Sequence, residues 1–140
     1  MIYYAKLSKQ KEGYLIEFTE LPGCLTEGKT KESALKNAKE ALNGWLAANC
    51  DRNLTIVLPV KRKGKSYSPI EVDLGVAFAI SLRRSRAKDG LTQTQAAKKL
   101  GISQQAYAKL ESAHTTNPSL STIQKLTKFL DFTVDFKIAS

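Results

Sequence analysis

Apolar and polar residues alternate in two short stretches near the start of the chain. Residues 2–7 and 14–18 are rich in β-branched and aromatic side chains, and the polar link between them ends at Gly13. This pattern predicts a β-hairpin. Leu-Pro-Gly-Cys at 21–24 predicts a turn, and residues 25–27 a short third strand.

The alternation then gives way to helical spacing. Between residues 31 and 49 apolar side chains recur every three or four positions, which predicts an amphipathic helix that covers the sheet, with Thr30 as its N-cap. An apolar run at 54–58 ends at Pro59, and a last strand is expected at 70–72. The first half is therefore predicted to be a small ββ(β)αβ unit.

Helical periodicity dominates from residue 74 onward. In the string Leu91 to Glu111, Thr92 is expected to cap a helix that ends at Gly101, and Ser103 to cap the next one. Two short helices that meet at a three-residue turn are typical of a helix-turn-helix.

After Pro118, Ser119 is expected to cap a further helix that ends near residue 130. The final segment alternates apolar and polar residues and predicts a strand over 131–140. A lone strand needs an edge to pair with, so we expect it to join two copies into a homodimer, or a tetramer built from dimers. The alternative is that it pairs within its own chain. The dimerisation residues would be Phe132, Val134, Phe136 and Ile138.

Charge adds a preference for an anionic partner. The net charge is +9, but residues 1–58 are nearly neutral, with eight basic and seven acidic side chains. Lys61, Arg62, Lys63 and Lys65 add four positive charges with no acid between them, either as a solvated loop or as a phosphate contact.

Cysteine and histidine usage gives no metal or cofactor site. Cys24 and Cys50 have no CxxC spacing and His114 is the only histidine, so we assign neither a metal nor a cofactor. The chain does not begin with a basic segment followed by an apolar stretch, and no run reaches the roughly 20 apolar residues of a membrane span. A cytoplasmic protein with reduced thiols and no membrane contact is expected.

The second half resembles the helix-turn-helix of the Cro/C1, or Xre-like, repressors over residues 74–130. The resemblance rests on Leu91-Thr92-Gln93, Ala97, Gly101, the pair Gln104 and Gln105, and Glu111. It implies a λ-repressor-like domain that binds operator double-stranded DNA, with the second helix in the major groove, where glutamine amides read base edges. Gln93 and two loop residues would contact the DNA backbone. The predicted DNA-binding set is Gln93, Ser103, Gln104, Gln105, Lys109, Thr116 and Asn117.

Arg83, Arg84, Arg86 and Lys88 precede this motif and would suit a phosphate patch. The resemblance implies instead that Arg86 forms a structural ion pair with Glu111, partly buried, and that Tyr107 lies in the core.

Residues 13–46 resemble the HicB antitoxin family, which carries a Gly-Tyr strand, the Leu-Pro-Gly-Cys turn and an Ala-rich helix. The resemblance implies a partial RNase H-like module that masks a HicA-like mRNA-cleaving toxin, while the helix-turn-helix represses their operon. We therefore predict an α+β protein: a HicB-like partner-binding module at 1–60, a basic linker and last strand at 61–73, the DNA-binding domain at 74–130, and the dimerisation strand at 131–140.

Two other classes of function are open. One is a plain helix-turn-helix repressor whose first module senses a ligand or oligomerises. The other is a divergent nuclease, but Glu17 and Glu20 are the only acids near the predicted sheet core, and no nucleophile with a neighbouring base is visible. We therefore assign no catalytic residue and expect a protein that is not an enzyme.

Overall fold

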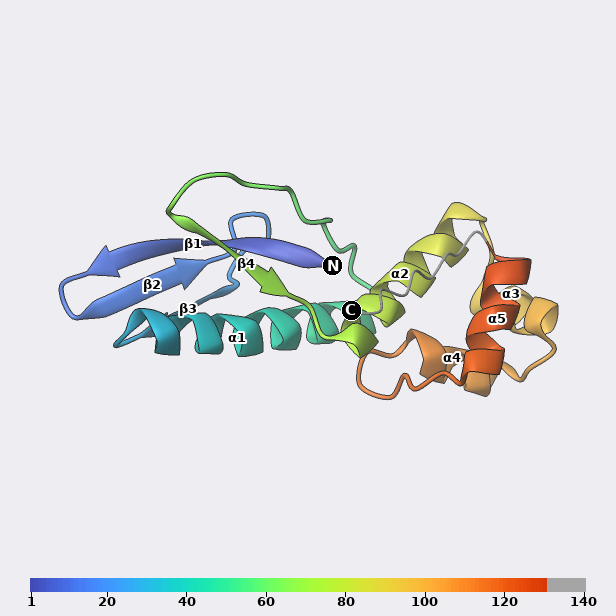
Figure 1. Cartoon of the computed structure of the whole chain (residues 1–140). Helices are drawn as coiled ribbons and strands as arrows, with labels where there is room; N and C mark the ends of the chain where they lie inside the picture. Colours follow the sequence, from blue (N-terminus) through green and yellow to red (C-terminus); the bar gives the residue numbers. More distant parts are fainter. Residues whose placement is uncertain (131–140) are drawn as a thin grey trace, which may run out of the picture. The chain divides into compact units, whose positions relative to one another are not determined.

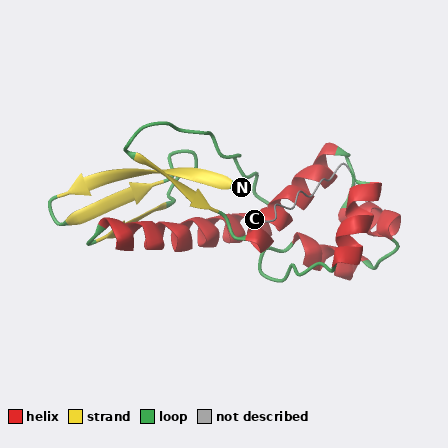
Figure 2. Ribbon diagram, in the orientation of Figure 1, coloured by secondary structure: helices red, strands yellow, loops and turns green. Residues whose placement is uncertain are grey.

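The computed structural model describes residues 1–130 and divides the chain into two compact units, residues 1–77 and 78–140. The boundary falls inside a helix, α2 (Figure 1). The elements are, in chain order, β1 (Ile2–Gln10), β2 (Gly13–Glu17), β3 (Leu25–Gly28), α1 (Lys31–Asp51), β4 (Tyr67–Glu71), α2 (Leu74–Lys88), α3 (Gln93–Leu100), α4 (Gln104–Glu111) and α5 (Leu120–Phe129). The predicted α+β class is confirmed, and the strands found among residues 1–130 all lie in the first unit (Figure 2).

The sheet of the first unit is antiparallel throughout, in the order β3-β2-β1-β4. The predicted hairpin is confirmed by the pairing of β1 with β2, which runs to Gln10 opposite Gly13. β4 pairs with the other edge of β1, where Tyr3 lies opposite Ile70. The last strand thus joins the sheet beside the first one.

α1 covers one face of this sheet (Figure 1). Its first turn begins at the Thr30 N-cap, whose side chain accepts a hydrogen bond from the Ser33 backbone N–H. Gly28 lies against this turn, because a Cβ there would come within 2.3 Å of the Ala34 nitrogen. The core between helix and sheet includes Tyr3, Ala5, Ile16 and Phe18 below the strands, and Ala34, Ala38, Leu42 and Leu46 on α1.

A long loop joins α1 to β4 and contains the basic run. Residues 54–58 form no strand, although the hydroxyl of Tyr3 donates to the carbonyl of Val57 at 2.7 Å. Arg62 donates to the Glu20 carboxylate at 2.7 and 3.0 Å, which ties the loop to the β2–β3 turn. The loop and β4 belong to the same unit as residues 1–60, because β4 completes the sheet. Both cysteines are buried here, and neither forms a disulfide.

The second unit is helical in its described part. Thr92 caps α3 and Ser103 caps α4, and Gly101 ends α3 at φ 69°, a left-handed conformation that favours glycine. The three residues between the helices form the tight turn that the sequence predicts. The core of this unit contains Leu82, Ala96, Ala97, Leu100, Tyr107, Leu126 and Leu130.

Candidate nucleic-acid interface

α3 and α4 pack together and leave the start of α4 exposed. Gln104 and Gln105 are the first two residues of α4, and both are solvent-exposed. Lys109, one turn or so further along, is exposed too, whereas Tyr107 faces the core with none of its surface accessible. Burial on one side and polar side chains on the other leave α4 with a surface able to enter a DNA groove.

An ion pair holds the end of α4 against α2. Arg86 donates to both oxygens of the Glu111 carboxylate, at 2.5 and 3.0 Å, and to the carbonyl of Leu91 at 2.9 Å. The Glu111 side chain is fully buried and that of Arg86 is 18% exposed. Arg83 also faces Glu111, since its Nε donates to the backbone carbonyl at 3.1 Å. Two of the four cations expected on this helix therefore point inward, away from the surface.

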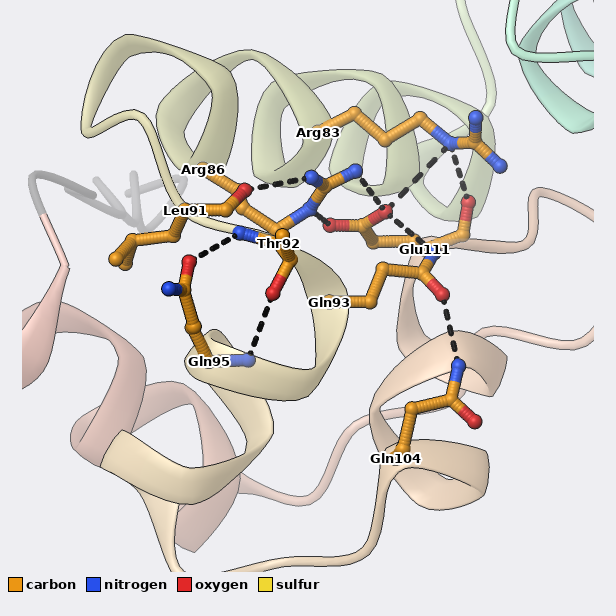
Figure 3. A network of polar contacts seen from close by, with 8 residues as sticks. All are labelled: Arg83, Arg86, Leu91, Thr92, Gln93, Gln95, Gln104 and Glu111. Carbon is orange, nitrogen blue, oxygen red and sulfur yellow. Dashed lines mark hydrogen bonds and ion pairs between the residues drawn. The ribbon is translucent and has the colours of Figure 1, made fainter.

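The ion pair continues to the surface through two glutamines (Figure 3). Gln93 Nε2 donates to Glu111 at 3.0 Å, and Gln104 Nε2 donates to Gln93 Oε1, also at 3.0 Å. An ionised carboxylate only accepts, so Glu111 fixes the orientation of the Gln93 amide, whose oxygen then faces Gln104. Gln104 must therefore donate to this oxygen. Its own oxygen and its second N–H remain for a base edge.

The pKa of Glu111 results from two opposing effects. Burial raises the pKa, but the hydrogen bonds from Arg86 and Gln93 outweigh burial, so the pKa is lowered from its ordinary value of 4.5. Burial, with the negative charge of Glu111, raises the pKa of Tyr107 far above its ordinary value. Glu111 is therefore a charged acceptor at neutral pH, and Tyr107 is a neutral phenol.

The remaining residues of the predicted DNA-binding set differ in their availability. Ser103 is exposed, but its hydroxyl oxygen accepts from the Ala106 backbone N–H at 3.1 Å as the helix cap. Asn117 is exposed. The Thr116 hydroxyl is covered by other atoms and has no hydrogen-bond partner in the described part of the chain. A phosphate contact by Thr116 would need its side chain to turn.

The predicted dimerisation residues Phe132, Val134, Phe136 and Ile138 lie outside the described residues.

The hydrogen-bonded chain from Glu111 through Gln93 to Gln104 was not predicted from the sequence, which indicated Gln93 and Gln104 only as separate DNA contacts. The sequence does contain one signal for it, a glutamine at the start of each helix of the motif.

Two compact units, one with an antiparallel sheet and one with the α3–turn–α4 arrangement, define a helix-turn-helix protein that carries an additional α+β unit. A helix-turn-helix family model matches residues 82–137. The chain is 30% identical over 115 residues to "Antitoxin HicB" of Escherichia coli strain K12, which covers 81% of this chain and 83% of that protein. It is also 30% identical over 108 residues to "Antitoxin HicB 1" of Photorhabdus laumondii, covering 76% and 68% of the two chains. The chain belongs to the HicB family of antitoxins.

Two solved structures are similar to part of the chain. The N-terminal domain of the Burkholderia pseudomallei antitoxin HicB has a TM-score of 0.43 and 20% identity, covering 53% of this chain and all of that one. A chain of the "HicA3 and HicB3 toxin-antitoxin complex" has a TM-score of 0.41 and 25% identity, covering 52% of this chain and 99% of that one. Within residues 1–130, none of the helices is long and apolar enough to cross a membrane. The same residues contain no cluster of three or more His, Cys, Asp or Glu that could hold a metal ion.

Proposed function

We propose that this antitoxin represses its own operon by sequence-specific binding of operator DNA, and that it binds and neutralises a HicA-like mRNA-cleaving toxin. The observation that carries the DNA-binding part is the exposed start of α4, where Gln104 is held by Gln93 while its amide oxygen and second N–H stay available. Neither role requires catalysis by the chain.

The proposed DNA contacts fall into two kinds. Gln104 and Gln105 read base edges in the major groove, where an amide can donate and accept at once on adenine. Lys109, one turn further along α4, also faces the groove. Asn117 and the start of α3 at Gln93 contact the phosphate backbone, and such contacts orient the protein without reading sequence. Because Gln104 is held in place before DNA arrives, less side-chain entropy is lost on binding.

Two recognition helices are needed for a full operator. A two-fold dimer would place them about one DNA turn, roughly 34 Å, apart. We propose that the segment 131–140, with its apolar residues at 132, 134, 136 and 138, pairs with its copy to hold that dimer together.

DNA binding is tested by fluorescence anisotropy with a labelled fragment of the chain's own promoter and a shuffled fragment of the same length. We expect the promoter fragment to bind at least about a thousandfold more tightly at physiological salt. Equal affinities for the two fragments would reject operator recognition and leave only non-specific binding by a basic protein.

Toxin neutralisation is tested by co-expression with the toxin product of the same operon. We expect growth arrest by the toxin alone and recovery when residues 1–77 or the whole chain is co-expressed. Recovery that requires the Gln104 and Gln105 side chains would assign the effect to repression instead of masking.

A further inference from the structure

The face of the sheet opposite α1 combines apolar side chains with acidic ones. Residues directly opposite one another on paired strands share a face, so the pairs Lys6 with Glu17, Glu17 with Leu25, and Lys6 with Tyr67 lie on one side. Alternation along each strand extends this side in both directions. We call it the outer sheet face. It consists of Ile2, Tyr4, Lys6, Ser8, Leu15, Glu17, Leu25, Glu27, Tyr67, Pro69 and Glu71.

The outer sheet face includes several accessible apolar side chains. Leu25 is 54% exposed and Ile2 is 43% exposed, and Pro69 is exposed as well. Tyr4 and Tyr67 are half-buried beside them. Exposed apolar side chains gathered on one face commonly mark interaction sites.

This face is also the acidic side of the first unit. It carries three carboxylates, Glu17, Glu27 and Glu71, against the single cation Lys6. The exposed charged positions of α1 are more evenly balanced, with three cations, Lys31, Lys36 and Lys39, and two acids, Glu32 and Glu40. The loop before β4 adds its basic run.

Resting on the proposed function, we propose that the outer sheet face is where the toxin binds. A protein that cleaves mRNA must hold a polyanion, so its RNA-binding surface carries lysine and arginine. The acids of the outer sheet face complement such a surface, whereas the basic loop repels it. The apolar side chains between the acids supply the desolvated centre of the interface, and the acids form its rim. Binding here covers the cations that the toxin needs for RNA.

Charge reversal with a matched control tests this assignment. Glu27→Lys and Glu71→Lys place a cation on the outer sheet face at exposed edge-strand positions, and Glu40→Lys makes the same charge change at an exposed position of α1. Affinity is measured by calorimetry between the full-length chain and the purified toxin product of the same operon, at low and at high salt. We expect each sheet variant to weaken binding about tenfold at low salt and less at high salt, and Glu40→Lys to bind like the parent.

A second pair of variants tests the apolar centre. Leu25→Lys is expected to weaken toxin binding about tenfold or more, while Leu58→Lys, also at an exposed leucine, leaves it unchanged. Thermal melting confirms that each variant is folded, and sedimentation of the chain alone follows self-association.

The outcomes separate this inference from the proposed function. A parent chain that does not bind the toxin overturns both. A parent that binds, with Glu27→Lys, Glu71→Lys and Leu25→Lys all binding equally well, overturns only the outer sheet face as the site. Leu25→Lys that changes self-association but not toxin affinity would assign the face to a second copy of this chain and overturn the inference.

Discussion

Replacing Arg86 with alanine is expected to destabilise the second unit. The change removes two hydrogen bonds to a fully buried carboxylate and one to the Leu91 carbonyl. Breaking a buried ion pair by removing one partner typically costs about 3–5 kcal/mol. Arg83 remains 3.9 Å from the carboxylate and Gln93 still donates to it, so we expect the lower end, about 3 kcal/mol. That is a large share of the stability of a small domain.

The loss can be assigned to one unit because the chain has a single tryptophan, Trp45, in the first unit. Its fluorescence during urea unfolding reports the first unit, while hydrogen exchange of the α3 and α4 amides reports the second. We expect Arg86→Ala to increase exchange in α3 and α4 and to leave the tryptophan transition in place. The double variant Arg86→Met with Glu111→Gln should recover most of the loss, because no buried charge is left unpaired.

One result would refute this reasoning. If Arg86→Ala exchanges like the parent but binds promoter DNA more weakly, with a shallower dependence on salt, the side chain is a phosphate contact and the ion pair contributes little.

Further predictions concern DNA affinity, dimerisation and the pH dependence of stability. Gln104→Ala and Gln105→Ala are each expected to weaken promoter binding by about 1–3 kcal/mol and to leave binding of shuffled DNA unchanged, since base contacts carry the discrimination; anisotropy would contradict this if both DNAs lose equally. Gln93→Ala should weaken binding of both DNAs, because it removes a backbone contact and also releases Gln104. Truncation after Leu130 is expected to yield monomers in sedimentation, and a dimer at micromolar concentration would place the interface elsewhere. The lowered pKa of Glu111 means that its stabilising contribution is complete above pH about 4.5 and is lost as pH falls through the lowered pKa; the stability advantage of the parent over Glu111→Gln should therefore shrink in acid melts, and a constant difference would be the opposing result.

Local signals explain why much of the second unit could be predicted. The caps Thr92 and Ser103 and the left-handed Gly101 each act within three or four residues, so they are readable from the sequence. The link from Gln93 to Gln104 is not local. It forms only when α3 and α4 cross and bring side chains 11 positions apart together.

Long-range packing explains why the segments after α1 were harder to predict from the sequence. β4 begins at Tyr67 and contains Pro69, a residue that weakens the local strand signal but is tolerated at a sheet edge. Residues 54–58 have the stronger strand composition and form none. The contact of Arg62 with Glu20 spans 42 positions, so the basic run gave no sign that one of its cations is paired. For β4 and for residues 54–58, tertiary contacts overrode the local strand preference.

The position of the two thiols makes site-specific labelling simple. Cys24 and Cys50 are the only cysteines of the chain, and both are buried in the first unit. Burial raises the pKa of Cys24 to about 11, so little thiolate is present at neutral pH to react with an alkylating dye. A cysteine placed at an exposed position of the second unit, such as Lys125→Cys on α5, would then react far faster than the native thiols. A fluorophore there could report on the helix-turn-helix alone, with both native cysteines left in place.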